Sequence, residues 1–361
     1  MNDCSELIEV LRPHLNWHRA RLCFLTAFVL ALIRVGSVNL AQVALGLNPW
    51  VQIASNYRRC QRFLAEFSFD QETIGRLILQ LLPQDALCLC LDRTEWKFGR
   101  VSINLLFIGV AHQGVAYPLV WCFLGKAGSS SLRERLRLLR RLLSFLPKER
   151  IQTLLADREF ACTGFLRYLR WHKLPYTLRI KAGSRVSYRG KSRPALQLFR
   201  HLRYGQWEAL PKPVKLWGQR TYLMGGDLKT GEYLLLMTQA DPQQAHLRYA
   251  GRWEIETLFK AFKSQGLDFE STHLTRAERL ESLIALMSIA LVWAHKVGEW
   301  LSQTKPIPLK NRAQAHTDPT HKARKLYSTF RYGLDYLRQL LFAAEARKNE
   351  LHACMRLLSC T

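Results

Sequence analysis

The sequence predicts a mixed α/β protein that begins with an all-α region. Apolar residues recur at helical spacing from the start of the chain to about residue 83. From Ala86 onwards, short apolar runs of strand length alternate with amphipathic helical segments. These segments follow the order β-β-β-α-β-α-β with a helix still to come, which is the order of the ribonuclease-H-like fold. We therefore expect this fold in the middle of the chain.

The composition is that of a folded protein with a polyanionic partner. The 361 residues are 48% hydrophobic and 22% charged, which excludes a disordered chain and leaves room for two or three domains. Lys and Arg number 53 against 28 Asp and Glu, so the net charge is +25. Such an excess favours nucleic acid as the partner, ahead of a membrane. A basic protein without a specific polyanionic partner is the alternative.

Cysteines and apolar stretches indicate a reducing, aqueous compartment. The nine cysteines are scattered without zinc-site spacing and are expected to be free, buried thiols. The two longest apolar stretches, at 23–33 and 283–294, are too short to span a bilayer. The N-terminus carries acidic residues where a signal peptide has a basic region. We expect a cytosolic protein that does not enter a membrane.

Residues 1–83 are expected to form a helical N-terminal DNA-binding domain. Within it, residues 34–62 contain four arginines and no acid. A helix, a break at Pro49 and a basic helix follow one another, as in a helix-turn-helix module. This pattern predicts that Arg58, Arg59 and Arg62 contact DNA. A plain helical bundle with solvated arginines fits the same residues equally well.

The predicted core, residues 84–303, begins with the strand "ALCLCLD", which is expected to end at Asp92. Two strands joined by a hairpin-like turn follow, and then a helix with Ser131 and Glu134 at capping-box spacing. The next strand, "IQTLLAD", is expected to end at Asp157. In the predicted fold these first and fourth strands are parallel neighbours.

A β-rich insertion is expected at about 182–240, before the last core helix, because short strand-like runs alternate there with Gly and Pro turns. Residues 182–220 contain nine basic residues and one acid. Trp207 and Trp217 could each stack on a displaced DNA base, or pack in the core. Residues 304–361 are expected to form a basic, partly helical tail.

The candidate site combines three acids. Asp92 and Asp157 are expected at the carboxyl edge of the sheet, where α/β proteins place their sites. A helix from about Gln243 through 266 carries Tyr249, Arg252, Glu256 and Lys263 along one edge, beside its apolar face. Glu256 would then approach the two aspartates. Three converging carboxylates repel one another and need cations.

Their oxygen ligands favour Mg²⁺, with Mn²⁺ as a substitute, and suit two-metal phosphoryl transfer. Other charged residues stand close to these acids in the sequence. Glu95, Glu159 and Glu254 are weaker candidates for the site. Arg93 and Arg158 follow the aspartates directly and either hold DNA or form salt bridges.

The spacing Tyr-x2-Arg-x3-Glu-x6-Lys resembles the Y-R-E-K signature of bacterial cut-and-paste DDE transposases of the insertion-sequence-4 group. "LDRTEW" and "LLADREF" resemble the group's first and second acidic motifs. "GKAGSSSLRERL" resembles its Gly-Asn-Ser loop, although Ala127-Gly128 departs from the commoner Gly-Asn. The resemblance covers roughly 85–300, includes an insertion before the third acid, and is weak or negligible elsewhere.

The resemblance implies a DDE transposase that binds the terminal inverted repeats of an insertion sequence, cleaves the DNA ends through a hairpin intermediate and joins them to target DNA. Asp92, Asp157 and Glu256 would be its catalytic acids, holding two Mg²⁺ ions. Arg252 and Lys263 would contact phosphates, with Tyr249 as a hydrogen-bond donor beside them.

The resemblance further implies a homodimer on paired ends, in the bacterial cytoplasm and associated with the nucleoid through double-stranded DNA. A catalytically silent or domesticated DNA-binding relative, or a structure-selective nuclease on the same fold, is the alternative. Only a transposase yields a strand-transfer product.

Overall fold

The computed structural model describes residues 3–67, 69–83, 85–228, 232–239, 241–310 and 324–359. Two units make up the chain. Unit 1 combines Met1–Leu82 with Thr257–Thr361, and unit 2 is Pro83–Glu256. The predicted core of 84–303 is therefore divided between the two units after Glu256.

Unit 1 is helical. Its N-terminal helices are α1 (Asp3–Leu11), α2 (Arg19–Val35), α3 (Leu40–Gly46), α4 (Ile53–Glu66) and α5 (Gln71–Gln80). Its C-terminal part contributes α10 (Ala277–Thr304), α11 (Thr329–Phe342) and α12 (Lys348–Arg356), with a 3₁₀ turn at Phe269–Ser271. The apolar stretch at 283–294 lies within α10.

Helix α10 is the centre of unit 1, in contact with α2, α4, α5 and α11. Apolar side chains surround it on all sides, as expected for a helix within a core. By length and composition it could cross a membrane, but 89% of its most apolar window is buried inside the protein. α2 and α3 would meet the same criterion as a pair, with a bend of 103° between them.

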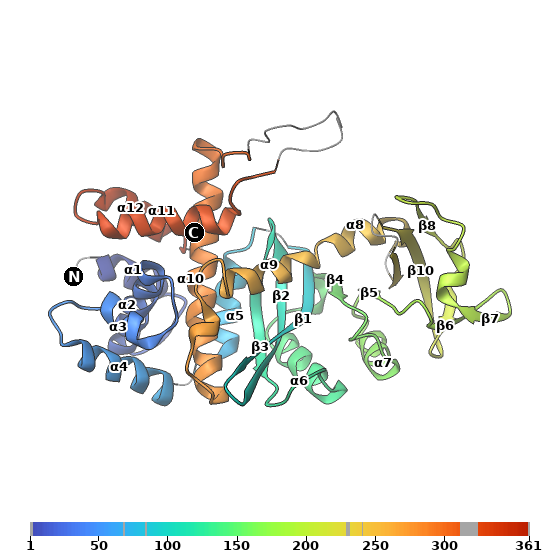
Figure 1. Ribbon diagram of the computed structural model, residues 1–361, viewed down its shortest axis with the longest axis horizontal. Coiled ribbons are helices and arrows are strands. Elements are labelled where there is room, and N and C mark those ends of the chain that lie inside the picture. The colour runs from blue at the N-terminus through green and yellow to red at the C-terminus, as the bar shows by residue number, and fades with distance from the viewer. Residues whose placement is uncertain are drawn as a thin grey trace. The chain divides into compact units, whose positions relative to one another are not determined.

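The expected C-terminal tail is part of the helical packing of unit 1. Residues 311–323 of that tail lie outside the described residues. Beyond them, α11 packs against α10 and α2, and α12 packs against α1 and α11 (Figure 1). The two ends of the chain therefore share one core.

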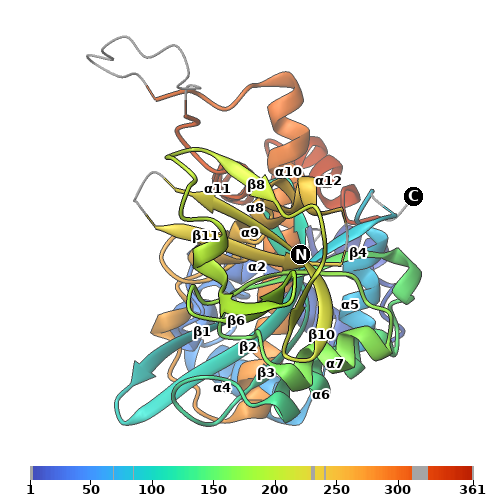
Figure 2. The same cartoon turned by 90° about the vertical axis from the view of Figure 1, so that its right-hand side faces the viewer.

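Unit 2 is built on a mixed sheet of eleven strands, of which the first five have the order β3-β2-β1-β4-β5. They are β1 (Leu87–Phe98), β2 (Val101–His112), β3 (Val115–Phe123), β4 (Ile151–Ala156) and β5 (Tyr176–Arg179). The predicted parallel pairing of the first and fourth strands is confirmed. Helix α6 (Leu132–Leu143) packs on β2 and β3, with α7 (Thr163–Trp171) beside it (Figures 1 and 2).

Strand β1 does not end at Asp92, as the sequence predicted, but continues to Phe98. Its second half forms an antiparallel ladder with β2 up to the pair Phe98–Val101. Because this half pairs with one neighbour only and is partly exposed, it lacks the apolar pattern of the first half. The capping box predicted for Ser131 and Glu134 is present at the start of α6.

The short strands predicted for 182–240 are observed. They are β6 (Arg185–Tyr188), β7 (Lys191–Pro194), β8 (Trp207–Ala209), β9 (Val214–Leu216), β10 (Gln219–Asp227) and β11 (Tyr233–Thr238). β11 pairs with β5, so these strands extend the first sheet in the order β11-β10-β9-β6-β7, and β8 pairs with β10. Figure 2 shows β6 and β10 facing the viewer.

The predicted continuous helix from about Gln243 through 266 is wrong. A 3₁₀ turn at Pro242–Gln244 leads into α8 (Ala245–Ala250), and α9 (Trp253–Phe262) follows after a break at Gly251 and Arg252. Across the break, backbone hydrogen bonds join residues three apart. Glycine has low helix propensity, and here the Gly251 carbonyl accepts a weak hydrogen bond from the Cys90 thiol, 3.4 Å away.

Candidate active site

The strand register brings the two aspartates together. Leu91 opposite Ala156 is the last parallel pair between β1 and β4. Asp92 and Asp157 are the next residue on each chain segment, so both leave the parallel ladder at the same edge of the sheet. Asp157 directly follows the last residue of β4. Their negative charges are close enough for Asp157 to raise the pKa of Asp92.

Arg252 joins the third acid to this pair. Its guanidinium donates to Asp92 Oδ2 at 3.2 Å and to Glu256 Oε1 at 2.7 Å. The residue is 6% exposed and lies 5.0 Å from the centre of the Trp253 ring. The sequence predicted that the three acids need cations and that Arg252 contacts a phosphate. Instead, a buried arginine bridges two of the three acids.

The site carries an unbalanced negative charge. Burial, reinforced by the charges of Glu159 and Asp157, raises the pKa of Asp92 to about 6, although the Arg93 backbone N–H and Arg252 oppose this rise. Among the described residues, Asp157 Oδ1 is buried without a hydrogen-bond partner, and its ion pair with Arg179 is long, at 3.8 Å. A carboxylate oxygen without a hydrogen bond in such surroundings fits a divalent cation. Asp92, Asp157 and Glu256 are the residues that could hold one.

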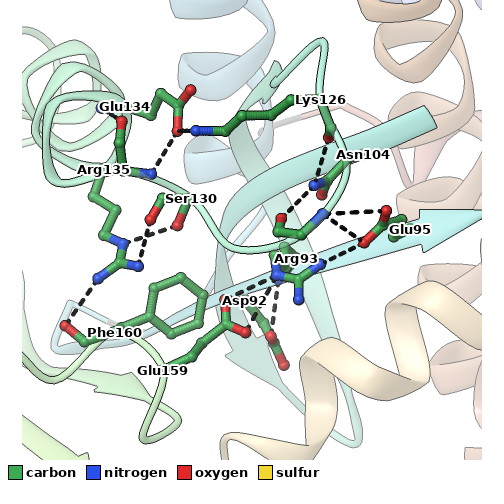
Figure 3. Close-up of polar contacts among 12 residues, drawn as sticks. Asp92, Arg93, Glu95, Asn104, Lys126, Ser130, Glu134, Arg135, Glu159 and Phe160 are labelled. Carbon is green, nitrogen blue, oxygen red and sulfur yellow. Dashed lines mark hydrogen bonds and ion pairs between the residues drawn. The ribbon is translucent and has the colours of Figure 1, made fainter. Parts of the chain in front are cut away.

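The neighbouring acids Glu95 and Glu159 are both bound to Arg93 (Figure 3). Arg93 donates to each at 2.9 Å. Glu95 also accepts from the Ser102 hydroxyl and from the Gly128 N–H. Arg93 therefore ties β1 to the turn after Asp157. Of the two arginines beside the aspartates, Arg158 remains exposed.

Glu254, the other weaker candidate, is half-buried. Its pKa is raised by burial, although the backbone N–H groups of Gly114 and His112 donate to it. These donors come from the turn between β2 and β3. Glu254 therefore anchors the start of α9 to that turn.

The sequence did not point to Arg135, which fixes the turn after Asp157. This buried arginine donates to the Ser130 hydroxyl at 2.8 Å, to the Ser130 carbonyl and to the Phe160 carbonyl (Figure 3). It joins the loop before α6 to the turn that follows Asp157. An arginine among leucines, in "LRERLRLLRRLL", was the available signal, but four other arginines in the same helix obscured it.

Tyr249 and Lys263, the other two residues of the Y-R-E-K spacing, contact residues other than the three acids. Tyr249 is 3% exposed and packs with the buried cluster of Ala209, Met224, Leu236 and Ala245. Its hydroxyl has no hydrogen-bond partner among the residues that the structure describes, and burial raises its pKa. Lys263 follows the end of α9, belongs to unit 1 and forms an ion pair with Glu270 at 2.9 Å.

The two tryptophans of the β-rich segment differ. Trp207 stacks on His246 with ring centres 4.9 Å apart and covers Gly226, where a Cβ atom would meet its ring at 2.3 Å. Trp207 is thus a packed residue. Trp217 is half-buried in the turn between β9 and β10, where its φ of 48° lies in the left-handed region. Gly218 beside it has a φ of 78°, and a two-residue hairpin turn of type I′ requires a positive φ at both central residues.

The three arginines predicted to contact DNA lie on the exposed face of α4. Asn56, buried on the opposite face, donates to the Ala44 and Asn48 carbonyls and so fixes the turn between α3 and α4. Arg58, Arg59 and Arg62 are all exposed. Within the described part of the chain, none of the three forms an ion pair. The arrangement leaves their charges available to a partner.

Comparison with known proteins finds a matching family model and a distant structural neighbour. The family model described as "Transposase DDE domain" matches residues 86–293. A comparison with curated proteins finds no match. Among solved structures, the piggyBac transposase synaptic complex with hairpin DNA is similar to this chain with a TM-score of 0.47 and 11% identity. That match covers 97% of this chain and 79% of the other.

Proposed function

The chain belongs to the transposase DDE domain family, and from that premise we propose that it cleaves DNA ends and joins them to target DNA with Asp92, Asp157 and Glu256 as its catalytic acids. The observation that carries the proposal is the strand register, which brings Asp92 and Asp157 to one edge, with Glu256 linked to Asp92 through Arg252. The order β3-β2-β1-β4-β5 supports a ribonuclease-H-like core.

We propose that the three acids hold two Mg²⁺ ions, or Mn²⁺ in their place. Two observations support this assignment: Asp157 Oδ1 accepts no hydrogen bond from the described residues, and the pKa of Asp92 is raised. Bound metal supplies Lewis-acid stabilisation of charge on the attacking and leaving oxygens in phosphoryl transfer. The protein fixes the acids through Arg93 and Arg135, which hold the turn after Asp157 from two sides.

Arg252 would change partners when DNA is bound. In the structure its guanidinium forms ion pairs with both Asp92 and Glu256. With cations on the acids, that charge becomes available to a phosphate, as the resemblance to the Y-R-E-K signature implies. Lys263 would contact a second phosphate, and the buried hydroxyl of Tyr249 would donate to a group near Arg252.

We propose that α3 and α4 recognise the terminal inverted repeat as a helix-turn-helix, with Arg58, Arg59 and Arg62 toward the DNA. Catalysis would occur in a homodimer on paired ends, with a hairpin intermediate at each end. Trp217, half-buried in the turn between β9 and β10, would contact the distorted DNA. Trp207 would act through the packing of β8 and β10.

The catalytic proposal is tested by removing each acid in turn. Asp92→Asn, Asp157→Asn and Glu256→Gln should each abolish cleavage and strand transfer in Mg²⁺, while binding to a labelled end fragment persists. Glu149→Gln, at an exposed acid on the 3₁₀ turn Lys148–Arg150, is the matched control. Near-normal cutting by any one of the three variants would remove that residue from the site. Cleavage without a strand-transfer product in the unmodified protein would indicate a nuclease.

A further inference from the structure

Unit 1 contains an open pocket between α2 and α4 that the catalytic proposal does not use. Its volume is about 270 Å³. Arginines and phenylalanines dominate its lining, which consists of Arg21, Phe24, Arg59, Arg62, Phe63, Glu66 and Phe67. Three positive charges face a single carboxylate, so the pocket is suited to an anion.

Two of the arginines are held in place by aromatic rings. The guanidinium carbon of Arg21 lies 4.8 Å from the centre of the Phe67 ring, and that of Arg59 lies 5.0 Å from the centre of the Phe24 ring. A guanidinium stacked in this way keeps its N–H groups free at the edge. Among the described residues, neither arginine forms an ion pair. Glu66, the carboxylate in the pocket lining, is exposed and pairs with neither of them in the described structure.

The rings form a rigid floor. Phe63 stacks on Phe67 with centres 5.2 Å apart, and Phe24 meets Phe63 edge-on at 4.8 Å. Trp17 closes the cluster against Phe67 at 4.8 Å. Because the floor is fixed, the two stacked guanidinium groups lose little further freedom when they bind a ligand.

The pocket lies along the helix that carries the exposed Arg58. Arg59 and Arg62 come from α4 itself, and Arg21 comes from the first turns of α2. Guanidinium groups match the oxygens of a phosphate in paired hydrogen bonds. We infer that this pocket binds one phosphate of the DNA backbone, next to the base pairs that α4 faces, and so fixes the position of α4 on the terminal repeat.

The inference rests on the proposed recognition of DNA by α4 and deepens it. It adds Arg21 to the proposed DNA interface and assigns a different role to each arginine. Arg21 and Arg59 hold the backbone, which carries no sequence information, and Arg58 is left for base contacts. The division gives each arginine a different experimental signature.

The first experiment measures the Kd of the full chain by fluorescence anisotropy at several NaCl concentrations. The probes are a terminal-repeat duplex and a random duplex of equal length. Arg21→Ala and Arg59→Ala should each weaken both duplexes by about 10-fold, the effect of losing one charge-assisted hydrogen-bonded contact. Each should also lower the slope of log Kd against log salt by about 1.

Matched variants separate this effect from loss of charge alone. Arg19→Ala lies on the same helix as Arg21 but outside the pocket, and should change neither affinity nor slope by as much. Arg58→Ala should weaken the terminal-repeat duplex more than the random one. Arg21→Lys keeps the charge and should retain the slope with a smaller loss of affinity. This variant also serves if Arg21→Ala fails to fold, as judged by circular dichroism.

A second experiment locates the phosphate. Single uncharged methylphosphonate linkages are placed along the terminal-repeat duplex one at a time. The unmodified protein should lose affinity at one linkage per end, and the Arg21→Ala, Arg59→Ala double variant should be insensitive to substitution there. If no linkage loses its effect in the double variant, the inference is overturned.

The outcomes distinguish this inference from the proposed function. If cleavage depends on the three acids but Arg21→Ala behaves like Arg19→Ala, only the pocket inference falls. If the acid variants still cut but Arg21→Ala loses affinity and slope, the pocket inference stands and the catalytic proposal falls. Inorganic phosphate that raises the melting temperature in an Arg21-dependent way, without an effect of Arg21→Ala on DNA binding, would show a free-anion site and overturn the inference.

Discussion

Asp92 is a half-buried carboxylate whose surroundings include Asp157, Glu159 and Arg252. Its pKa of about 6 means that the folded protein favours the protonated form, chiefly because of burial. Above that pH the charged group reduces stability in the absence of metal. The shift from 3.8 corresponds to an upper limit of about 3 kcal/mol.

We therefore expect Asp92→Asn to stabilise the metal-free protein. In EDTA at pH 8 the free energy of unfolding should rise by about 1–2 kcal/mol, since the loss of the Arg252 contact offsets part of the gain. As the pH falls from 6 toward 4, Asp92 itself becomes protonated and the gain should disappear. Urea denaturation across this pH range is the measurement. Equal stability of both proteins at every pH would contradict the assigned burial cost.

Adding Mg²⁺ to unmodified protein and to Asp92→Asn tests whether Asp92 binds the metal. Metal that binds the folded state stabilises it by mass action. Unmodified protein should therefore gain stability on addition of Mg²⁺, while Asp92→Asn gains less. An equal gain in both would place the metal elsewhere.

The three acids and Arg252 differ in how far the sequence predicts their surroundings. Asp92 and Asp157 could be placed together because each follows an apolar run of strand length, and parallel strands align such positions. The ion pairs of Arg252 with Asp92 and Glu256 could not be predicted. Helical spacing tells on which edge of the helix a side chain lies, but not which group of another element faces that edge. Tyr249 was expected near phosphates for the same reason, and its hydroxyl is buried.

At the scale of elements, the crossing of α10 and α11 depends on two glycines. A Cβ on Gly333 would lie 1.9 Å from the Ala294 carbonyl oxygen and 2.4 Å from the Gly298 nitrogen. Both contacts are with backbone, which cannot rotate away. The two helices therefore approach closely only because both positions lack side chains.

Gly333→Ala should accordingly force α11 away from α10 and lower the free energy of unfolding by about 3 kcal/mol or more. Gly183→Ala is the control, because a Cβ at Gly183 meets nothing within 4 Å and its φ is not positive. Thermal unfolding by circular dichroism measures both. A Gly333→Ala variant as stable as Gly183→Ala would show that the helices can separate without cost.

The elements themselves were mostly visible in the sequence. Capping residues and apolar periodicity predicted α6, and Gly and Pro turns predicted the strands between residues 182 and 240. The break between α8 and α9 was not visible, because one glycine within an apolar helical pattern is usually tolerated. At the break the Gly251 carbonyl contacts Cys90 of β1, and that contact joins residues far apart in the chain.

At the scale of the whole chain, the C-terminal helices return to the N-terminal ones within unit 1. Nothing in the local pattern of residues 324–359 indicates which helices they will meet, so they could be predicted only as a basic tail. The net charge of +25, in contrast, is a property of composition alone. Where the basic residues lie in the structure determines which of them can contact DNA, and this can be tested.

The basic charge of unit 2 includes a pair that folding alone does not explain. Lys215 on β9 and Arg220 on β10 are exposed and directly opposite each other. Like charges in directly opposite positions destabilise an antiparallel pair. Such a pair is compatible with a surface that meets a polyanion, as proposed for DNA beside this segment.

The double variant Lys215→Gln, Arg220→Gln should therefore be as stable as the unmodified protein or more stable, by up to about 0.5 kcal/mol, and yet bind DNA more weakly. If both side chains contact phosphates, the slope of log Kd against log salt for a random duplex should fall by about 2. Arg133→Gln with Arg137→Gln, two exposed arginines on α6, removes the same net charge and is the matched control. An equal fall in slope for both double variants would mean that DNA responds to the total charge of the protein. A fall confined to the Lys215 and Arg220 variant would identify this face of the sheet as part of the DNA path, because only charges at the interface release counterions on binding.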